Sequence, residues 1–177
     1  MAGLRERLVF DTEAGVVRDG PRRYLLMRPD VLMGLFARLD AGARTVALQA
    51  FAEAAEAQGG DSLSAYFARL GGDQEAFLEA TAAAAADLGW GRWQFSRDAD
   101  ALRLVVVGSP FAQGWPKAHT EPVCAPIRGI LAAAAALVLG VEAKAGTRSG
   151  LLAEERVCAA AGHARCEFVA RVAGAPG

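Results

Sequence analysis

Two of the three cysteines in this 177-residue sequence fall within one short segment, with a carboxylate beside them. The segment AEERVCAAAGHARCEFV carries Glu155, Cys158, His163 and Cys166, and the third cysteine, Cys124, lies in EPVCAPIRGI. Thiolates, imidazoles and carboxylates are the side chains that bind zinc in proteins. The same residue types also act as nucleophile and base in catalysis, and two cysteines can form a disulfide.

The two clustered cysteines are expected to face each other across a β-hairpin. If the strands fold back about Gly162, Cys158 and Cys166 lie opposite one another, with Cβ atoms roughly 4.5–5.5 Å apart on one face. Two thiolates at that separation can share a tetrahedral cation. Glu155 precedes Cys158 by three residues, which on an ideal strand places it on the opposite face. A β-bulge or turn is therefore needed to direct its carboxylate toward the cysteines.

A proline locates the third cysteine relative to the helix that follows it. Pro126 is tolerated only among the first residues of a helix, so this helix must begin close to Cys124. The positive end of the helix dipole would favour the thiolate form of Cys124. The thiolate is the form that binds metal.

Other interpretations of these residues remain open. Cys124 taken alone is typical of a small buried hydrophobic residue. The hairpin cysteines could form a disulfide, although an odd number of cysteines and a reducing compartment disfavour it. His163 could be a turn residue, or it could replace Glu155 as the fourth ligand. His119 could act as the base for a catalytic Cys124.

Composition limits the class of protein. The length suits one domain over residues 1–177, and 53% of the residues are hydrophobic. The net charge of −1 predicts no basic surface for nucleic acid or anionic lipid. No stretch approaches the roughly 18 uninterrupted apolar residues of a membrane span, and the N-terminus is charged where a signal peptide is apolar. We therefore expect a cytoplasmic protein without a membrane span or nucleic-acid partner.

Hydrophobic spacing predicts a block of short strands followed by four helices over residues 1–89. The strands lie within 7–27, and the first helix begins at Pro29. A second helix ends at Gly59–Gly60, Asp61 caps a third, and Asp73 caps a fourth. The apolar stripe of the first helix is expected to comprise Val31, Leu32, Leu35, Phe36 and Leu39.

Strand-like alternation then predicts a hairpin over 90–107, a loop over 108–122 and, after the helix from Cys124, a final hairpin over 151–172. Residues 172–177 are expected to form a frayed tail. These elements together predict an α+β fold, in which helices pack on an antiparallel sheet.

Three of these segments together resemble the 4-vinyl reductase domain family. They are VVVGSPFA at 105–112, PVCAPIRGIL at 122–131 and EERVCAAAGHARCEFV at 154–169, all within the region 90–171. The earlier stretch RYLLMRPDVLMGLF is similar to single-domain members described as predicted hydrocarbon-binding proteins.

The resemblance implies a fold related to haem nitric-oxide sensors and to subunits of vesicle-tethering complexes. Bacterial members serve as sensory domains of regulators that respond to phenols and alkylbenzenes, and one is an accessory protein of bacteriochlorophyll (tetrapyrrole) synthesis. The regulators also contain an ATPase and a DNA-binding domain, which these 177 residues do not include. In the sensors three cysteines and a glutamate hold zinc, and the matching positions here are Cys124, Glu155, Cys158 and Cys166. Four such ligands saturate a tetrahedral zinc, so the implied site is structural.

The implied ligand is a hydrophobic or aromatic small molecule. Trp93 and Phe95 alternate onto one face of their strand, and Ile127 and Leu131 lie on the helix expected to cover that sheet. Trp115 could form part of a lid, and Arg128 could meet an acidic group of the ligand. The candidate ligand-binding residues are therefore Trp93, Phe95, Trp115, Ile127, Arg128 and Leu131. These apolar residues could equally fill a solid core.

Two further functions compete with that of a zinc-stabilised sensory or accessory domain. The helix after Cys124 carries small residues at Gly129, Ala132, Ala133 and Ala136, which would let a second copy approach in a homodimeric interaction module or pack within the chain. A reductase is disfavoured because the sequence has no G-x-G-x-x-G or G-x-x-x-x-G-K-[ST] signature for a nucleotide.

Overall fold

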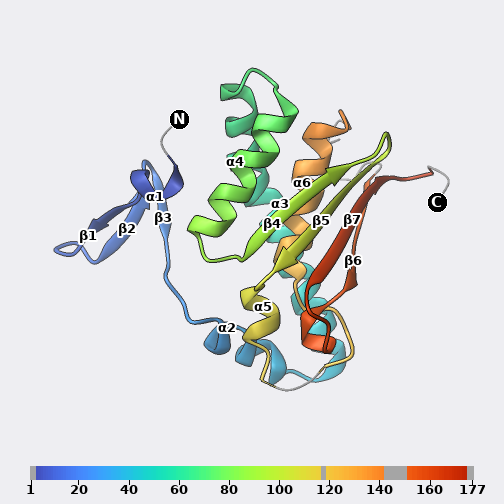
Figure 1. Cartoon of the computed structure of the whole chain (residues 1–177). Coiled ribbons are helices and arrows are strands. Elements are labelled where there is room, and N and C mark those ends of the chain that lie inside the picture. Colours follow the sequence, from blue (N-terminus) through green and yellow to red (C-terminus); the bar gives the residue numbers. More distant parts are fainter. Residues whose placement is uncertain (1–2, 117–118, 142–150, 175–177) are drawn as a thin grey trace.

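Alternating apolar residues build the central antiparallel sheet, in which the strands follow the order β4-β5-β7-β6 (Figure 1). The computed structural model describes residues 3–116, 119–141 and 151–174. The four strands are β4 (Arg92–Arg97), β5 (Ala101–Val107), β6 (Leu151–Val157) and β7 (Cys166–Val172). Trp93 pairs with Val106 and Phe95 with Leu104, so the predicted hairpin and its apolar face are confirmed. The predicted α+β class with an antiparallel sheet is confirmed as well.

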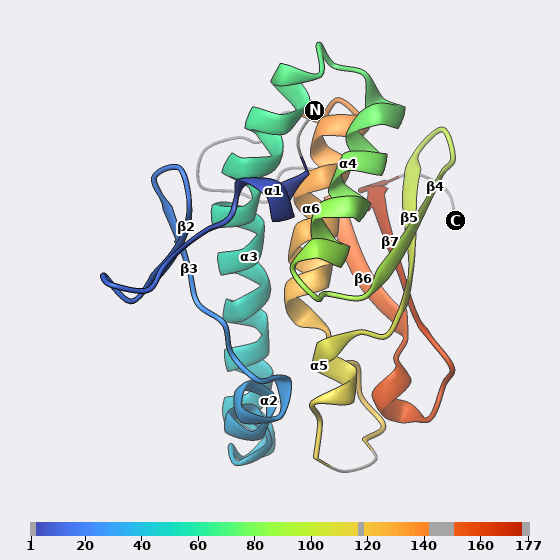
Figure 2. The same cartoon turned by 60° about the vertical axis from the view of Figure 1, so that its left-hand side comes forward.

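Helix α6 (Ala125–Val138) covers the apolar face of this sheet (Figure 2). It begins immediately after Cys124, and Pro126 occupies its first turn, as the sequence predicted. The side chains of Ile127 and Leu131, both on α6, are fully buried. A longer helix, α3 (Ala41–Arg69), packs along α6.

The run Gly59–Gly60 does not end a helix, and Asp61 does not cap one, because α3 continues through all three residues. A Cβ at Gly59 would collide with the Ile130 side chain of α6, and a Cβ at Gly129 would collide with the backbone of Ala52 in α3. The glycines therefore permit a close helix–helix approach. The small residues of α6 serve this contact within the chain, where Gly129, Ala132 and Ala133 are buried.

The remaining helices pack around α3. Asp73 caps α4 (Gln74–Asp87) by accepting a hydrogen bond from the Ala76 amide, as predicted. Helix α2 (Pro29–Ala37) begins at the predicted proline. Its expected stripe is partly wrong, because Val31 and Leu35 are 59% and 60% exposed. Phe36 is buried as predicted, and Met33, which the stripe did not include, is fully buried where α2 packs on α3 and α5.

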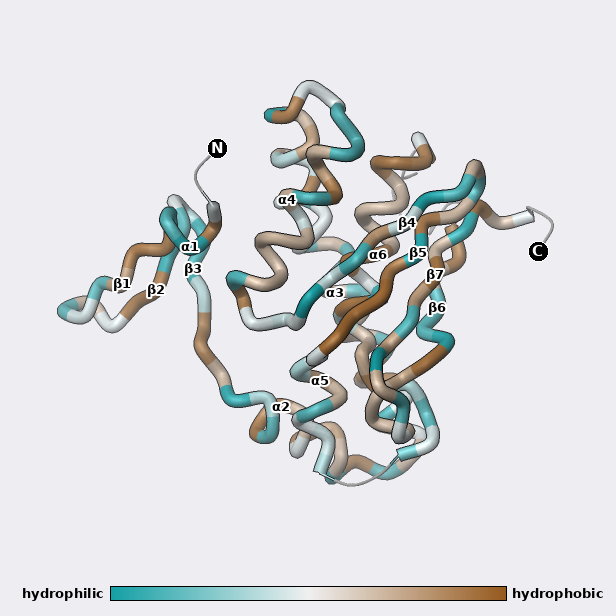
Figure 3. Tube along the Cα trace, viewed as in Figure 1, coloured by the Kyte–Doolittle hydropathy of each residue, from teal (hydrophilic) through white to brown (hydrophobic). Residues whose placement is uncertain are grey.

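The first residues form a separate small unit, here called the N-terminal unit (residues 3–24). It contains a short helix and a three-stranded antiparallel meander: α1 (Leu4–Arg7), β1 (Val9–Asp11), β2 (Val16–Asp19) and β3 (Arg22–Tyr24). The strands were predicted, but α1 was not, and β3 ends three residues before Met27. Residues 25–27 form an apolar extended connection to α2 (Figure 3), with Leu25 77% and Leu26 74% exposed.

Short elements occupy two segments expected to be irregular. The loop 108–122 contains α5 (Pro110–Gln113), which Ser109 caps, and a 3₁₀ turn (Ala159–Ala161) lies between β6 and β7. Strand β7 includes Val172, and residues 175–177 of the predicted tail lie outside the described residues. Among the residues described, no helix is both long and apolar enough to cross a lipid bilayer.

The close approach of α3 and α6 predicts opposite effects for two glycine-to-alanine changes. Gly129→Ala forces a methyl group into the Ala52 backbone, and we expect it to lower the free energy of unfolding by about 2–3 kcal/mol. Gly60→Ala places its methyl group 3.5 Å from Ala133, an ordinary contact. This change should raise the free energy of unfolding by about 0.5–1 kcal/mol. Urea unfolding of both variants tests this, and equal effects would contradict the proposed role of Gly129.

Candidate metal centre and ligand cavity

Three sulfurs and one carboxylate converge where α6 begins beside the final hairpin. The ligand atoms of Cys124, Glu155, Cys158 and Cys166 all lie within 4.8 Å of one another. The Cys124 Sγ is 3.7 Å from Cys166 Sγ and 4.0 Å from Cys158 Sγ. Zinc–sulfur bonds of about 2.3 Å in a tetrahedron place sulfurs about 3.8 Å apart. The spacing therefore suits a tetrahedral metal ion.

An irregularity in β6 brings Glu155 to the same side as the cysteines. Glu155 pairs with Phe168, but Val157 pairs with Glu167, so the register shifts between them. The extra residue reverses the alternation of side chains along the strand. The β-bulge predicted as a requirement for Glu155 to join the site is confirmed.

The start of α6 is tied directly to this carboxylate. The Cys124 amide donates a 2.8 Å hydrogen bond to Glu155 Oε2, which occupies one of the free amides at the helix start. The other oxygen, Oε1, is buried and has no hydrogen-bond partner among the described residues. An unpartnered buried carboxylate oxygen beside three thiols is the arrangement that a bound cation would satisfy.

Burial and mutual hydrogen bonds perturb the acidity of these groups. Burial, with the nearby Cys158, raises the pKa of Glu155 to about 8. Hydrogen bonds from Cys124 and Cys158, and from the Ala159 amide, lower the pKa of Cys166 to about 4. Donation to the other two sulfurs, together with burial, raises the pKa of Cys124. Four acidic groups share one small buried volume, and a divalent cation would stabilise their ionised forms.

Ser109 supports the cluster, and the sequence analysis assigned it no role. Its hydroxyl lies 3.2 Å from Cys124 Sγ and accepts from the Ala112 amide. Because its oxygen already accepts that bond, its hydrogen is free to be donated to the sulfur. A serine before proline at a helix start is a capping signal, and it could have located this residue.

The structure bears on the disulfide and on the two histidines as alternatives to a metal site of three cysteines and Glu155. The three cysteines are free thiols rather than disulfide partners. His163 is exposed in the turn of the hairpin and lies outside the cluster. His119 stacks on Trp115, with ring centroids 4.9 Å apart, and its amide donates to the Ala160 carbonyl. Neither histidine belongs to the group of clustered ligand atoms.

The residues predicted to bind a ligand are not all brought together. Trp93 lines an apolar cavity, and Phe95 contacts Trp93 along the neighbouring α4–β4 groove. Arg128 donates to Gln49 and lines a polar groove beside Glu155. The guanidinium of Arg44 covers Trp115 at 5.8 Å. Ile127 and Leu131 belong to the solid core.

The cavity has a volume of about 430 Å³ and lies between α3, α4 and β4. Trp90 and Trp93 form part of its wall, and Leu4 and Tyr24 of the N-terminal unit form another part. Sequence reasoning missed the contribution of α3 and α4. The small residues that face the cavity from these helices, Ala54, Ala55, Ala84 and Ala85, were the available signal.

Comparison with known proteins supports the fold without defining a family. No protein-family model matches the sequence, and no curated protein matches it significantly. The crystal structure of the phenol-responsive sensory domain of the transcription activator PoxR, with phenol, aligns with a TM-score of 0.75 at 18% identity, covering 96% of this chain and 86% of that one. A trafficking protein particle complex subunit 3 from Naegleria fowleri, covalently bound to palmitic acid, aligns with a TM-score of 0.45 at 13% identity, covering 81% and 94%.

Removal of one sulfur should abolish metal binding. We expect Cys158→Ser to lose stoichiometric metal and to unfold roughly 10 °C lower than the wild type, which corresponds to about 3 kcal/mol in a domain of this size. His163→Ala removes a histidine of the same hairpin that lies outside the cluster. This variant should keep the metal content and the unfolding temperature of the wild type. Elemental analysis and thermal unfolding of the purified variants test this. Unchanged metal content in Cys158→Ser would refute the metal centre.

Proposed function

We propose that this protein is a sensory or accessory domain that binds a small hydrophobic or aromatic molecule in the cavity between α3 and α4. The observation that carries the proposal is the cavity itself, which measures about 430 Å³ and has mostly apolar walls. Ligand sites are typically concave, apolar and about 300–1,000 Å³ in volume. A volume at the low end of this range favours an aromatic ring or an acyl chain over a tetrapyrrole.

A similarity of fold and a similarity of sequence motifs support a sensory role. The chain shares its fold with a sensory domain that responds to phenol. The motifs around Ser109, Cys124 and Glu155 also resemble those of the 4-vinyl reductase domain family, whose sensory members respond to aromatic compounds.

We infer further that the cluster of Cys124, Glu155, Cys158 and Cys166 holds a structural zinc ion. Three thiolates and a carboxylate match the ligands and the coordination number of zinc, and they leave no position for water or substrate. The ion would fasten the start of α6 to the final hairpin. Elemental analysis of the purified wild type tests the identity of the metal, and one zinc per chain is the expected result.

A homodimer is supported by the exposed apolar surface near the N-terminus. Leu25, Leu26 and Met27 are 77%, 74% and 49% exposed, and Val31 and Leu35 continue this surface onto α2. Exposed apolar surface of this extent is typical of an interaction site, and two-fold pairing of identical surfaces is the commonest way to bury it. We propose that a second copy of the chain covers residues 25–35.

Filling the cavity should remove binding without unfolding the protein. Trp90 and Trp93 line the cavity, so their fluorescence should report the binding of 1-decanol. Ala84 faces the cavity, whereas Ala83 of the same helix is exposed. We expect Ala84→Phe to weaken decanol binding by about tenfold or more and Ala83→Phe to leave it unchanged. Absence of saturable binding to the wild type would contradict the proposed pocket.

Polar substitution of the exposed connection should dissociate the dimer. The wild type is expected to have twice the 18.4 kDa mass of one chain in size-exclusion chromatography with light scattering. The double variant Leu25→Ser/Leu26→Ser should raise the dimer dissociation constant by about tenfold or more. Leu152→Ser changes another exposed leucine, on β6, and should leave the dimer dissociation constant unchanged. A monomeric wild type would contradict this proposal.

A further inference from the structure

Polar side chains from α3 and α4 form a rim along an otherwise apolar cavity wall. Thr81 is buried, and its hydroxyl donates to the Phe77 carbonyl, so it is already satisfied. Gln58, Ser62 and Tyr66 lie four residues apart on α3 and line the cavity without being fully buried. This spacing places all three on one face of the helix.

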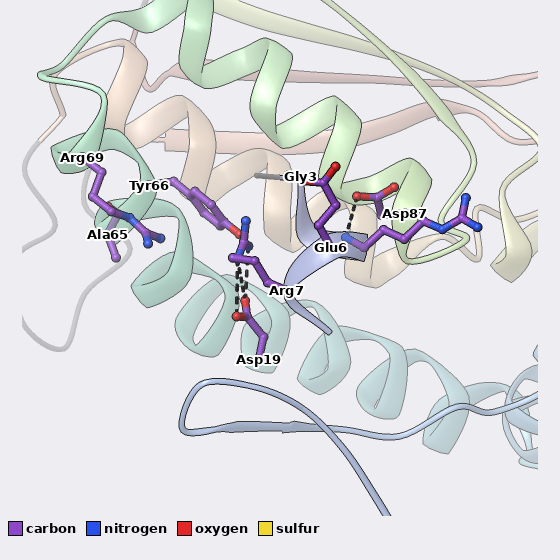
Figure 4. Close-up of polar contacts among 9 residues, drawn as sticks. Gly3, Glu6, Arg7, Asp19, Ala65, Tyr66, Arg69 and Asp87 are labelled. Carbon is purple, nitrogen blue, oxygen red and sulfur yellow. Dashed lines mark hydrogen bonds and ion pairs between the residues drawn. The ribbon is translucent and has the colours of Figure 1, made fainter. Parts of the chain in front are cut away.

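Tyr66 is the best-placed hydrogen-bond donor of this rim. Its hydroxyl oxygen accepts from the Arg7 guanidinium (Figure 4). Within the described parts of the chain, no acceptor for its hydroxyl hydrogen is found. A hydroxyl that accepts from a cation is polarised and becomes a stronger donor. Tyr66 can therefore donate to an oxygen atom of a molecule in the cavity.

Two guanidinium groups flank the Tyr66 ring. The Arg7 guanidinium carbon lies 5.3 Å from the ring centroid, and that of Arg69 lies 4.8 Å from it. Asp19 pairs with Arg7 at 3.2 Å and balances one of these charges. The carboxylate of Asp87 accepts a 3.0 Å hydrogen bond from the Arg5 amide and keeps its negative charge. Among the described residues Arg69 has no carboxylate partner, so its positive charge beside the Tyr66 ring is not balanced by a direct ion pair.

Tyr24 adds a second neutral hydroxyl to the rim from the N-terminal unit. Burial, with the nearby Asp19, raises the pKa of this phenol, so it remains protonated and able to donate. A cavity with apolar walls and a rim of donors and cations complements one kind of molecule. Such a molecule has an apolar body and a single acidic oxygen-bearing head.

We propose that the cavity binds an amphiphilic monoacid, with its carboxylate at the rim between Tyr66, Arg7 and Arg69 and its apolar body between α3 and α4. This inference rests on the proposed function and specifies the chemical class of its ligand.

The test compares two probes that differ only in the head group. Decanoate and 1-decanol have the same chain length, and neither absorbs where tryptophan does, so the fluorescence of Trp90 and Trp93 can follow both. We expect decanoate to bind about tenfold more tightly than decanol at low ionic strength. This preference should shrink as salt is added, because the rim is partly exposed.

Three variants assign the preference to the rim. Arg69→Met leaves the Arg7–Asp19 pair of the N-terminal unit intact, since Arg69 contacts the Ala65 carbonyl and the Tyr66 ring. It should weaken decanoate binding by about three- to tenfold and leave decanol binding unchanged. Tyr66→Phe should also weaken decanoate binding more than decanol binding. The control Arg103→Met removes a guanidinium of β5 that pairs with Asp98. It should change neither the decanoate affinity nor the decanol affinity.

The outcomes separate the head-group inference from the proposed function. Saturable binding of decanol that equals or exceeds that of decanoate would overturn the amphiphilic acid while leaving the apolar pocket intact. A decanoate preference that survives both Arg69→Met and Tyr66→Phe would overturn the assignment to this rim. Failure of both probes to bind would overturn the pocket and the inference together.

Discussion

The tie between the start of α6 and the final hairpin is the constraint on which the rest of the molecule depends. The Cys124 amide donates to Glu155, and the Cys124 sulfur meets those of Cys158 and Cys166. This contact joins segments more than thirty residues apart in the chain and sets where α6 begins over the sheet. Without a cation, the same groups place acidic side chains and an unpartnered oxygen in a buried volume, which is unfavourable.

The position of α6 is transmitted to the cavity through its contact with α3. Gly129 meets the Ala52 backbone, and Ile130 meets Gly59 and also lines the cavity. The wall of the cavity therefore depends on how closely these two helices pack. Close-packed interiors have low compressibility and transmit strain, so the cluster of Cys124, Glu155, Cys158 and Cys166 is coupled to the cavity through packed helices although the two share no residue.

Much of the candidate metal centre could be predicted from local chemistry, whereas the cavity could not. Pro126 located the start of α6, and Gly162 located the hairpin turn. The position of Glu155, three residues before Cys158, required a bulge to bring both to the same face of the strand. Each of these is a property of a few neighbouring residues. The run Gly59–Gly60 is ambiguous by contrast, because glycine both ends helices and permits close approach, and only Ile130 on a distant helix decides between the two. A cavity is the absence of side chains from several elements at once, so alanines in α3 and α4 indicate it only after those helices are placed.

Helix α3 has a further geometric consequence. Its 29 residues span about 43 Å, with Arg44 and Gln49 in the polar groove beside Glu155 and with Gln58 to Tyr66 along the cavity. Close contacts at Ala52 and at Gly59 hold α3 against α6, so one rigid helix carries a wall of the groove and a wall of the cavity. Occupancy of the cavity and the shape of the distant groove are thereby geometrically linked.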